Sequence, residues 1–344
     1  MKTEKIVIKM HGVTLGVSCK EKIINKTIQS FFSYFISVQK KSDIDIEVVF
    51  MNKREEFIFG LIKNYDTVGR RIFISGDDMV VTRLILFSGT SMQCNYKNKK
   101  LYLKMYFDNS LKPKLLTEEN IIRKLFFYII FFPLFWYLSQ VKCMFLLHGG
   151  GVRVGSTGIV FSGLQGVGKS TIILSLVNGG KTKFLSDNLY LYDSNNVYQC
   201  FESIRIDQKA IDFIGLKQGV LDDINIDTDL GRRLYKINKK YMIYSFSPDT
   251  LLIPQFARKT ELVQITVEEC LKKCLTFNRL AGEVREYDYY SAPLDLLVKN
   301  ENYYRKHIAS LELLIKRIKK RFVLNIRKGD NRENVLKKTI YKII

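Results

Sequence analysis

The feature that most constrains the fold of this chain is the stretch GLQGVGKS, residues 163–170, which matches the pattern GxxxxGK[ST]. An apolar run at residues 159–161 predicts a strand that enters this stretch, and residues 171–177 predict a helix that leaves it. Strand, glycine loop and helix in this order are the context that a phosphate-binding loop, or P-loop, requires. The pattern therefore predicts an α/β fold around a triphosphate site.

The residue types in this loop suit phosphate chemistry. Glycines allow successive backbone N–H groups to face a phosphate, and the helix N-terminus adds the positive end of its dipole. Lys169 is expected to reach the outer phosphates, and the Ser170 hydroxyl is expected to ligate Mg²⁺. We therefore expect Mg²⁺ and ATP as ligands, with the nucleotide held by Gly163, Gln165, Gly166, Val167, Gly168, Lys169, Ser170 and Thr171.

A carboxylate follows the predicted helix. Asp187, in the stretch FLSDN, is expected at the end of a strand that returns beside the P-loop strand. A carboxylate in that position can hold magnesium, orient a nucleophile or accept a hydroxyl proton, and the spacing does not choose among these roles. The alternative is a turn aspartate before the run LYLYD.

Three further polar residues are candidates for the site. His148 precedes three glycines just before the P-loop strand, where an imidazole can hydrogen-bond to phosphate or carry charge, or can be structural. Glu202 and Arg205 flank a short predicted strand. Each of these two can bind magnesium or phosphate, and each can equally be a surface charge.

Composition excludes several other classes of protein. The chain of 344 residues has a net charge of +21, of which residues 1–150 hold +10 and residues 301–344 hold +9. This diffuse basic surface lacks the features of a specific nucleic-acid reader, so we expect none. Six scattered cysteines and the lack of an N-terminal apolar core predict reduced thiols and a cytoplasmic location. The fourteen apolar residues at 125–138 are too few for a transmembrane segment and predict a buried helix.

The pattern along the chain predicts two parts. Residues 1–140 alternate short strand-like runs with turns, include a helix near residues 22–38, and form an α+β region that ends with the buried apolar helix at 117–138. Residues 141–344 form the P-loop catalytic domain, which has a mixed sheet and includes predicted helices at 267–277 and 300–321.

The order LHGGGV, GIVFSGLQGVGKST and FLSDN resembles the catalytic domain of HPr kinase/phosphorylase and its relatives, with a nucleotide site of the phosphoenolpyruvate-carboxykinase type. The resemblance covers about residues 144–190. It implies that His148 lies in the active site, that Asp187 is the base for an acceptor serine, and that Ser170 and Glu202 assist magnesium. Two features depart from the family: Asn188 replaces the second of its paired aspartates, and its glycine-rich signature is not recognisable at residues 201–207.

These observations predict an Mg-ATP-dependent kinase that transfers the γ-phosphoryl group to a serine hydroxyl of a peptide or small protein. In this interpretation Asp187 and Ser170, with Glu202, also form the metal site, while His148 or Arg205 stabilises the developing charge. A P-loop ATPase or nucleotide-regulated module is the alternative, and a degenerate kinase that binds ATP without turnover is a third interpretation. The sequence leaves open the acceptor, which includes precursor peptides and free serine, the reverse phosphorylase reaction, and assembly into a homo-oligomer.

Overall fold

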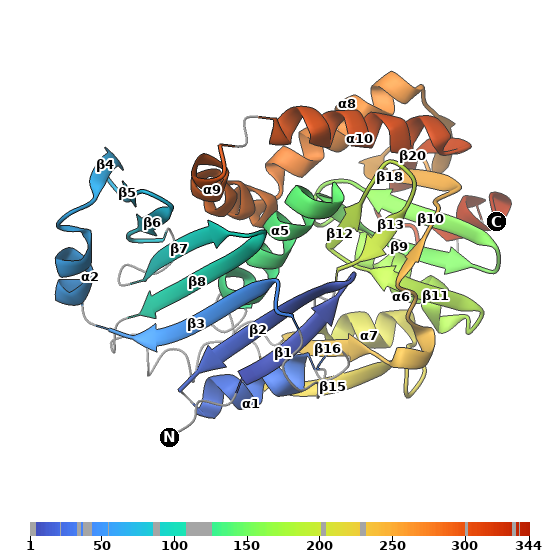
Figure 1. Cartoon of the computed structure of the whole chain (residues 1–344). Coiled ribbons are helices and arrows are strands. Elements are labelled where there is room, and N and C mark those ends of the chain that lie inside the picture. The colour runs from blue at the N-terminus through green and yellow to red at the C-terminus, as the bar shows by residue number, and fades with distance from the viewer. Residues whose placement is uncertain are drawn as a thin grey trace. The chain divides into compact units, whose positions relative to one another are not determined.

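The computed structural model describes residues 5–20, 22–32, 36, 43–53, 55–84, 90–107, 126–200, 204–227, 232–299, 302–331, 335–336 and 338–344 (Figure 1). The chain divides into two compact units. The first contains residues 1–142 and 287–303, and the second contains residues 143–286 and 304–344. Residues 287–303, which the sequence pattern grouped with the catalytic domain, thus belong by their contacts to the first unit.

The first unit is built on one mixed sheet with the strand order β1-β2-β3-β8-β7-β6-β5-β4. The pairs β2/β3 and β3/β8 are parallel, and the other pairs are antiparallel. Its elements are β1 (Lys5–Met10), β2 (Val13–Cys19), α1 (Lys22–Phe31), β3 (Ile46–Asn52), α2 (Glu55–Ile62), β4 (Asp66–Gly69), β5 (Ile72–Ser75), β6 (Asp78–Val81), β7 (Ser91–Lys97), β8 (Lys100–Phe107), η2 (Phe127–Phe131) and α5 (Phe132–Lys142).

The apolar run that precedes the second unit packs into the core of the first unit. It forms a π-helical turn, η2, followed by α5, and both elements contact β2 and β3. The indole N–H of Trp136 donates to Asp295 Oδ1 over 2.9 Å, and the Phe132 ring packs at a tilt against the rings of Tyr287 and Tyr290. The expected helix is therefore helical and buried from Phe126 onward, while residues 117–125 lie outside the described residues. Among the described residues, no helix combines the length and apolar character that crossing a bilayer requires.

The second unit contains a mixed sheet with the order β17-β13-β12-β9-β10-β18-β20-β19, in which β11 also pairs with β9, and a small sheet with the order β14-β16-β15. Its elements are β9 (Phe145–Val154), β10 (Thr157–Ser162), α6 (Lys169–Asn178), β11 (Thr182–Ser186), β12 (Leu189–Tyr192), β13 (Val197–Gln199), β14 (Ile204–Asp207), α7 (Gln208–Ile214), β15 (Leu221–Asp227), β16 (Arg232–Ile237), η3 (Lys239–Tyr241), β17 (Ser245–Phe246), β18 (Thr250–Ala257), β19 (Glu261–Gln264), α8 (Val267–Leu280), α10 (Tyr303–Arg317), β20 (Lys320–Arg327) and η4 (Ile340–Lys342). The helix α9 (Gly282–Leu297) begins in this unit and continues into the first.

The long strand β9 is the centre of the second unit. It pairs antiparallel with β10 on one side, and with β12 and then β11 on the other. A Cβ on Gly149 would lie 1.9 Å from the Phe161 carbonyl oxygen, and a Cβ on Gly150 would lie 2.7 Å from the Ser186 carbonyl oxygen. Glycine is required at both positions because no side chain fits between the crowded backbones.

The structure corrects one expectation about the strands near the glycine loop. The sequence suggested that the Asp187 strand returns beside the P-loop strand, but β11 pairs with β9, which lies between them. Asp187 follows directly after β11, and Asp187 with Asn188 separates β11 from β12. Asn188 has φ = 93°, a left-handed conformation that ends the extended run. The helices α2, α7 and α9 were not predicted, because their sequences lack a clear apolar period.

We predict that Gly149→Ala destabilises the second unit by about 3 kcal/mol or more, because the new Cβ would collide with backbone that cannot move aside. Urea unfolding followed by circular dichroism measures the change. Gly60→Ala, in α2, is the control, because no atom lies within 4 Å of its added Cβ. Equal stability of the two variants would contradict the crowding at β9.

Candidate phosphate-binding site

The loop between β10 and α6, which we call the glycine loop (Gly163–Ser170), turns through two left-handed glycines. Gly166 has φ = 82° and Gly168 has φ = 87°, and Gly168 is the residue that precedes the first turn of α6. In this conformation neither glycine has an atom within 4 Å of where a Cβ would lie, so the surroundings leave the loop surface open. Such a turn into a helix N-terminus directs backbone N–H groups at a common anion.

Lys169 lies across this loop rather than in solvent. Its side chain is 6% exposed, and its Nζ donates to the carbonyl oxygens of Gly163 at 2.8 Å and Leu164 at 2.7 Å. Burial lowers the pKa of Lys169 to about 8, against the opposing effects of Asp187 and Glu283. An arriving phosphate would offer the ammonium group a partner of opposite charge and would raise that pKa again.

Asp187 lies beside the helix that carries Ser170. Its carboxylate hydrogen-bonds with the Ser170 side chain and feels the positive charge of Lys169, while its Oδ1 is shielded from solvent and has no hydrogen-bond partner. Burial raises the pKa of Asp187, and these two neighbours oppose the rise. A shielded carboxylate with an unused oxygen is suited to accept a proton or to complete the coordination of a cation.

The backbone brings His148 next to the start of the glycine loop. His148 lies within β9, and the next residue, Gly149, pairs with Ser162 at the end of β10 and donates its N–H to the Asn188 carbonyl oxygen over 2.8 Å. The imidazole is buried near the backbone of Gly163 and the side chain of Asn188, and its Nδ1 has no hydrogen-bond partner among the described residues. Burial, together with the charge of Lys169, lowers the pKa of His148 to about 4, so the ring is neutral at pH 7.

A buried amide holds β9 where β10 turns away into the glycine loop. Asn278, in α8, accepts the His148 N–H through Oδ1 at 2.7 Å and donates through Nδ2 to the Leu146 carbonyl oxygen at 3.3 Å. The pairing of β9 with β10 ends at Gly149, so Asn278 supplies the hydrogen bonds that a strand would otherwise supply. The position of His148 therefore depends on α8 as well as on the sheet.

The site also includes a residue that sequence reasoning missed. Glu283 is half-buried in the first turn of α9. Its negative charge opposes the lowering of the pKa of both His148 and Lys169 by burial. Its position follows from Asn278, which fixes the end of α8 against β9 shortly before α9 begins. No sequence motif marks Glu283, because its proximity to the glycine loop arises only from tertiary packing.

The remaining predicted site residues lie on the glycine loop, on α6 and in the small sheet, apart from Glu202. Gln165 lies on the exposed part of the glycine loop, Val167 is buried, and Thr171 is half-buried in α6. Arg205 lies on β14 in the small sheet, paired with Leu234, and Glu202 lies outside the described residues. The described part of the chain contains no group of three or more histidine, cysteine, aspartate or glutamate side chains arranged to hold a metal ion.

Comparisons with known proteins find weak structural likeness to solved structures. No protein-family model matches the chain, and no curated protein matches it. Among solved structures, the HPr(Ser) kinase/phosphatase from Coxiella burnetii aligns with 35% of this chain and 77% of its own, at 11% identity and a TM-score of 0.21. A likeness at this level does not establish a shared fold.

We predict that Lys169→Met raises the pKa of His148 above its value of about 4, because the substitution removes a positive charge that disfavours the imidazolium. A ¹H–¹³C NMR titration of the imidazole signals measures the shift, with His148→Gln assigning the resonance. His307, whose pKa burial alone lowers to about 4, is the internal control and should not shift. A His148 pKa that is the same in both proteins would contradict the proximity of the two side chains.

Proposed function

We propose that this protein is an Mg-ATP-dependent kinase that transfers the γ-phosphoryl group to a serine hydroxyl of a peptide or small protein. One observation carries the proposal: the shielded carboxylate of Asp187 hydrogen-bonds with Ser170, within the electrostatic influence of Lys169, at the N-terminal end of the helix that follows the glycine loop. A P-loop brings the phosphates to this position, and a carboxylate beside them can receive the proton of an acceptor hydroxyl.

In the proposed reaction, the amides of the glycine loop and Lys169 bind the phosphates. The acceptor oxygen forms a bond to the γ-phosphorus, the bond between that phosphorus and the β–γ bridging oxygen breaks, and ADP leaves. The hydroxyl proton passes to Asp187, whose pKa burial raises, which increases its affinity for a proton. Neutral His148, beside the Gly163 backbone, can donate a hydrogen bond to a phosphate oxygen without adding charge.

The site also fits magnesium. The Ser170 hydroxyl and the unpartnered Oδ1 of Asp187 are hard oxygen donors, and Mg²⁺ commonly needs only one or two protein oxygens beside phosphates and water. A dense cluster of protein ligands is therefore not required. When bound, the ion would neutralise phosphate charge; Ser170 and Asp187 would hold it, with Glu202 as a further candidate.

Asp187 could accept the proton of a serine hydroxyl or of a water molecule, because each nucleophile must lose a proton when it attacks phosphorus. The kinase is therefore distinguished from a P-loop ATPase by where the labelled phosphate goes. We also propose that the acceptor is a serine of a peptide or small protein and that the protein is cytoplasmic. The alternative is a regulatory ATPase, which would hydrolyse ATP without phosphorylating an acceptor. The experiment below distinguishes the two.

We predict that Asp187→Asn reduces phosphoryl transfer from γ-labelled ATP by about a hundredfold or more while the nucleotide still binds, because the amide cannot accept the proton. Transfer is measured to serine peptides, small proteins and free serine, and binding by fluorescence of a labelled ATP analogue. Lys169→Met should lose both binding and transfer, because it removes the charge that reaches the phosphates.

Asp212→Asn, on the exposed side of α7, makes the same chemical change away from the site and should leave both measurements unaltered. Release of labelled phosphate to water by the unmodified protein, with no labelled acceptor, would replace the kinase with the ATPase. Full transfer by Asp187→Asn would remove Asp187 from the mechanism.

A further inference from the structure

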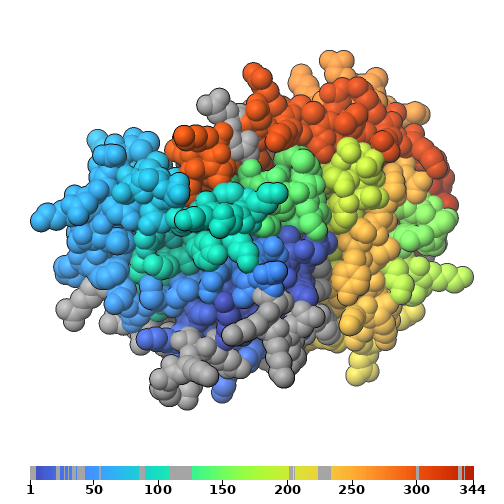
Figure 2. Space-filling view, viewed as in Figure 1, coloured from blue at the N-terminus to red at the C-terminus, as the bar shows by residue number. Residues whose placement is uncertain are grey.

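A hollow of about 350 Å³ opens on one face of the sheet in the first unit. Four strands line it, β3, β6, β7 and β8, through Glu47, Val49, Asp78, Gln93, Cys94, Asn95, Tyr102, Leu103 and Lys104. The atoms of β7 and β8 reach the molecular surface in the face shown in Figure 2. The hollow belongs wholly to the first unit and contains none of the residues of the phosphate-binding site.

Strand register arranges the side chains of the hollow in two rows. One row runs Asp78, Asn95, Tyr102 and Glu47 across β6, β7, β8 and β3. The next row contains Gln93, Lys104 and Val49, in direct register on β7, β8 and β3. Because directly paired residues face the same side of a sheet, all these side chains share the face that carries the hollow.

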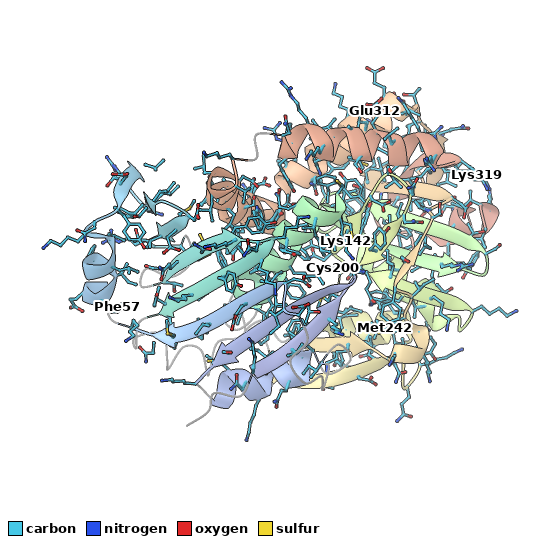
Figure 3. The ribbon with its side chains drawn as sticks, in the orientation of Figure 1. Phe57, Lys142, Cys200, Met242, Glu312 and Lys319 are labelled. Carbon is cyan, nitrogen blue, oxygen red and sulfur yellow. The ribbon has the colours of Figure 1, made fainter. Side chains whose placement is uncertain are left out.

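The helix α2 covers the neighbouring part of this face. Ile58 packs with Val80 and Tyr106, and Tyr65 packs against this cluster. Phe57, labelled in Figure 3, extends from the same helix and its ring lies 5.5 Å from that of Tyr106. The hollow therefore has a wall of apolar and aromatic groups beside its polar rows.

Asp78 is held in place by neutral groups. Its carboxylate accepts hydrogen bonds from Asn95 Nδ2 at 3.0 Å and Gln93 Nε2 at 3.4 Å, and it also hydrogen-bonds with the Tyr65 hydroxyl. Gln93 is itself fixed, because its Oε1 accepts the Tyr106 hydroxyl over 2.9 Å. Three neutral partners orient the carboxylate, and none of them carries a positive charge that would balance it.

The charge of Asp78 is not neutralised within the described residues. No ion pair joins Asp78 to a cation in that part of the chain, whereas nearby Glu47 pairs with Lys5 Nζ at 2.7 Å. The negative charge of Asp78 acts on its surroundings. Burial, then Tyr65 and then Asp78 raise the pKa of Tyr106 to about 12, and burial followed by Asp78 raises the pKa of Cys94. Asp78 is thus an oriented anion that faces the hollow without a counter-ion.

Lys104 supplies the opposite charge on the same face. Within the described residues it has no ion-pair partner, and β7 separates its strand from that of Asp78. Two strand spacings place the two backbones roughly 10 Å apart, with an offset of two residues along the strands. That separation leaves room for a small molecule between the carboxylate and the ammonium group.

We propose that the hollow binds a free α-amino acid, with its ammonium group on Asp78, its carboxylate on Lys104 and an apolar side chain against Val49 and Tyr102. A zwitterion satisfies both unpaired charges at once, whereas a simple cation or anion would satisfy one and face the other. The volume is at the small end of ligand pockets, which suits a molecule of this size.

The test measures binding of L-phenylalanine and L-leucine to the full chain by isothermal titration calorimetry. N-acetyl-L-phenylalanine lacks the cation, L-phenylalaninamide lacks the anion, and glycine lacks the side chain. Each of these should bind about tenfold or more weakly than L-phenylalanine, because each loses a charged contact or the apolar one. Equal binding of the acetylated or amidated compound, or no binding of either amino acid, would overturn the proposal.

Two substitutions locate the site. Asp78→Asn and Lys104→Gln should each weaken L-phenylalanine binding about tenfold, because each removes one charged contact while nearly preserving shape. Asp66→Asn and Lys97→Gln are matched exposed controls in the same unit and should not alter binding. Binding unchanged in both site variants would place the amino acid elsewhere. The Lys104 side chain is exposed, so Lys104→Gln should fold. This variant keeps the test decisive if Asp78→Asn fails to fold.

Discussion

The close approach of backbones at Gly149 and Gly150 holds β9 beside the glycine loop and beside Asp187 in the candidate phosphate-binding site. Their missing side chains let β9 lie against Phe161 in β10 and against the chain at Ser186 and Asp187. β10 leads directly into the glycine loop, and Ser186 leads directly into Asp187. A single crowded strand therefore brings together a loop, a carboxylate and an imidazole that are distant in the sequence.

The pKa shifts in the site follow from the burial that this close packing of backbones produces. Lys169, Asp187 and His148 are all shielded from water, and burial is the largest cause of the pKa shift at each of them. The charges partly compensate, since Lys169 opposes the rise at Asp187, and Asp187 opposes the fall at Lys169. A dianionic or more highly charged phosphate group would add the negative charge that this positively biased loop and helix N-terminus favour.

The sequence was informative where local pattern determines structure. The strand, glycine loop and helix around residues 163–170 form as the pattern predicts, and the buried helix is present from Phe126 onward. Pattern could not reveal Glu283 or Asn278, which reach β9 only because α8 packs against it. It also misplaced the Asp187 strand, because the order of strands in a sheet is decided by long-range packing that a local window does not contain.

The most direct test of the central claim is a crystal structure of the full chain with Mg²⁺ and a non-hydrolysable ATP analogue. Our account predicts the phosphates on the amides of the glycine loop, with Lys169 Nζ turned from the Gly163 and Leu164 carbonyl oxygens toward the outer phosphates, and with Asp187 beside the terminal phosphate. Two results would contradict it. One is a nucleotide bound elsewhere, and the other is Lys169 Nζ still bonded to the Gly163 and Leu164 carbonyl oxygens at saturating nucleotide.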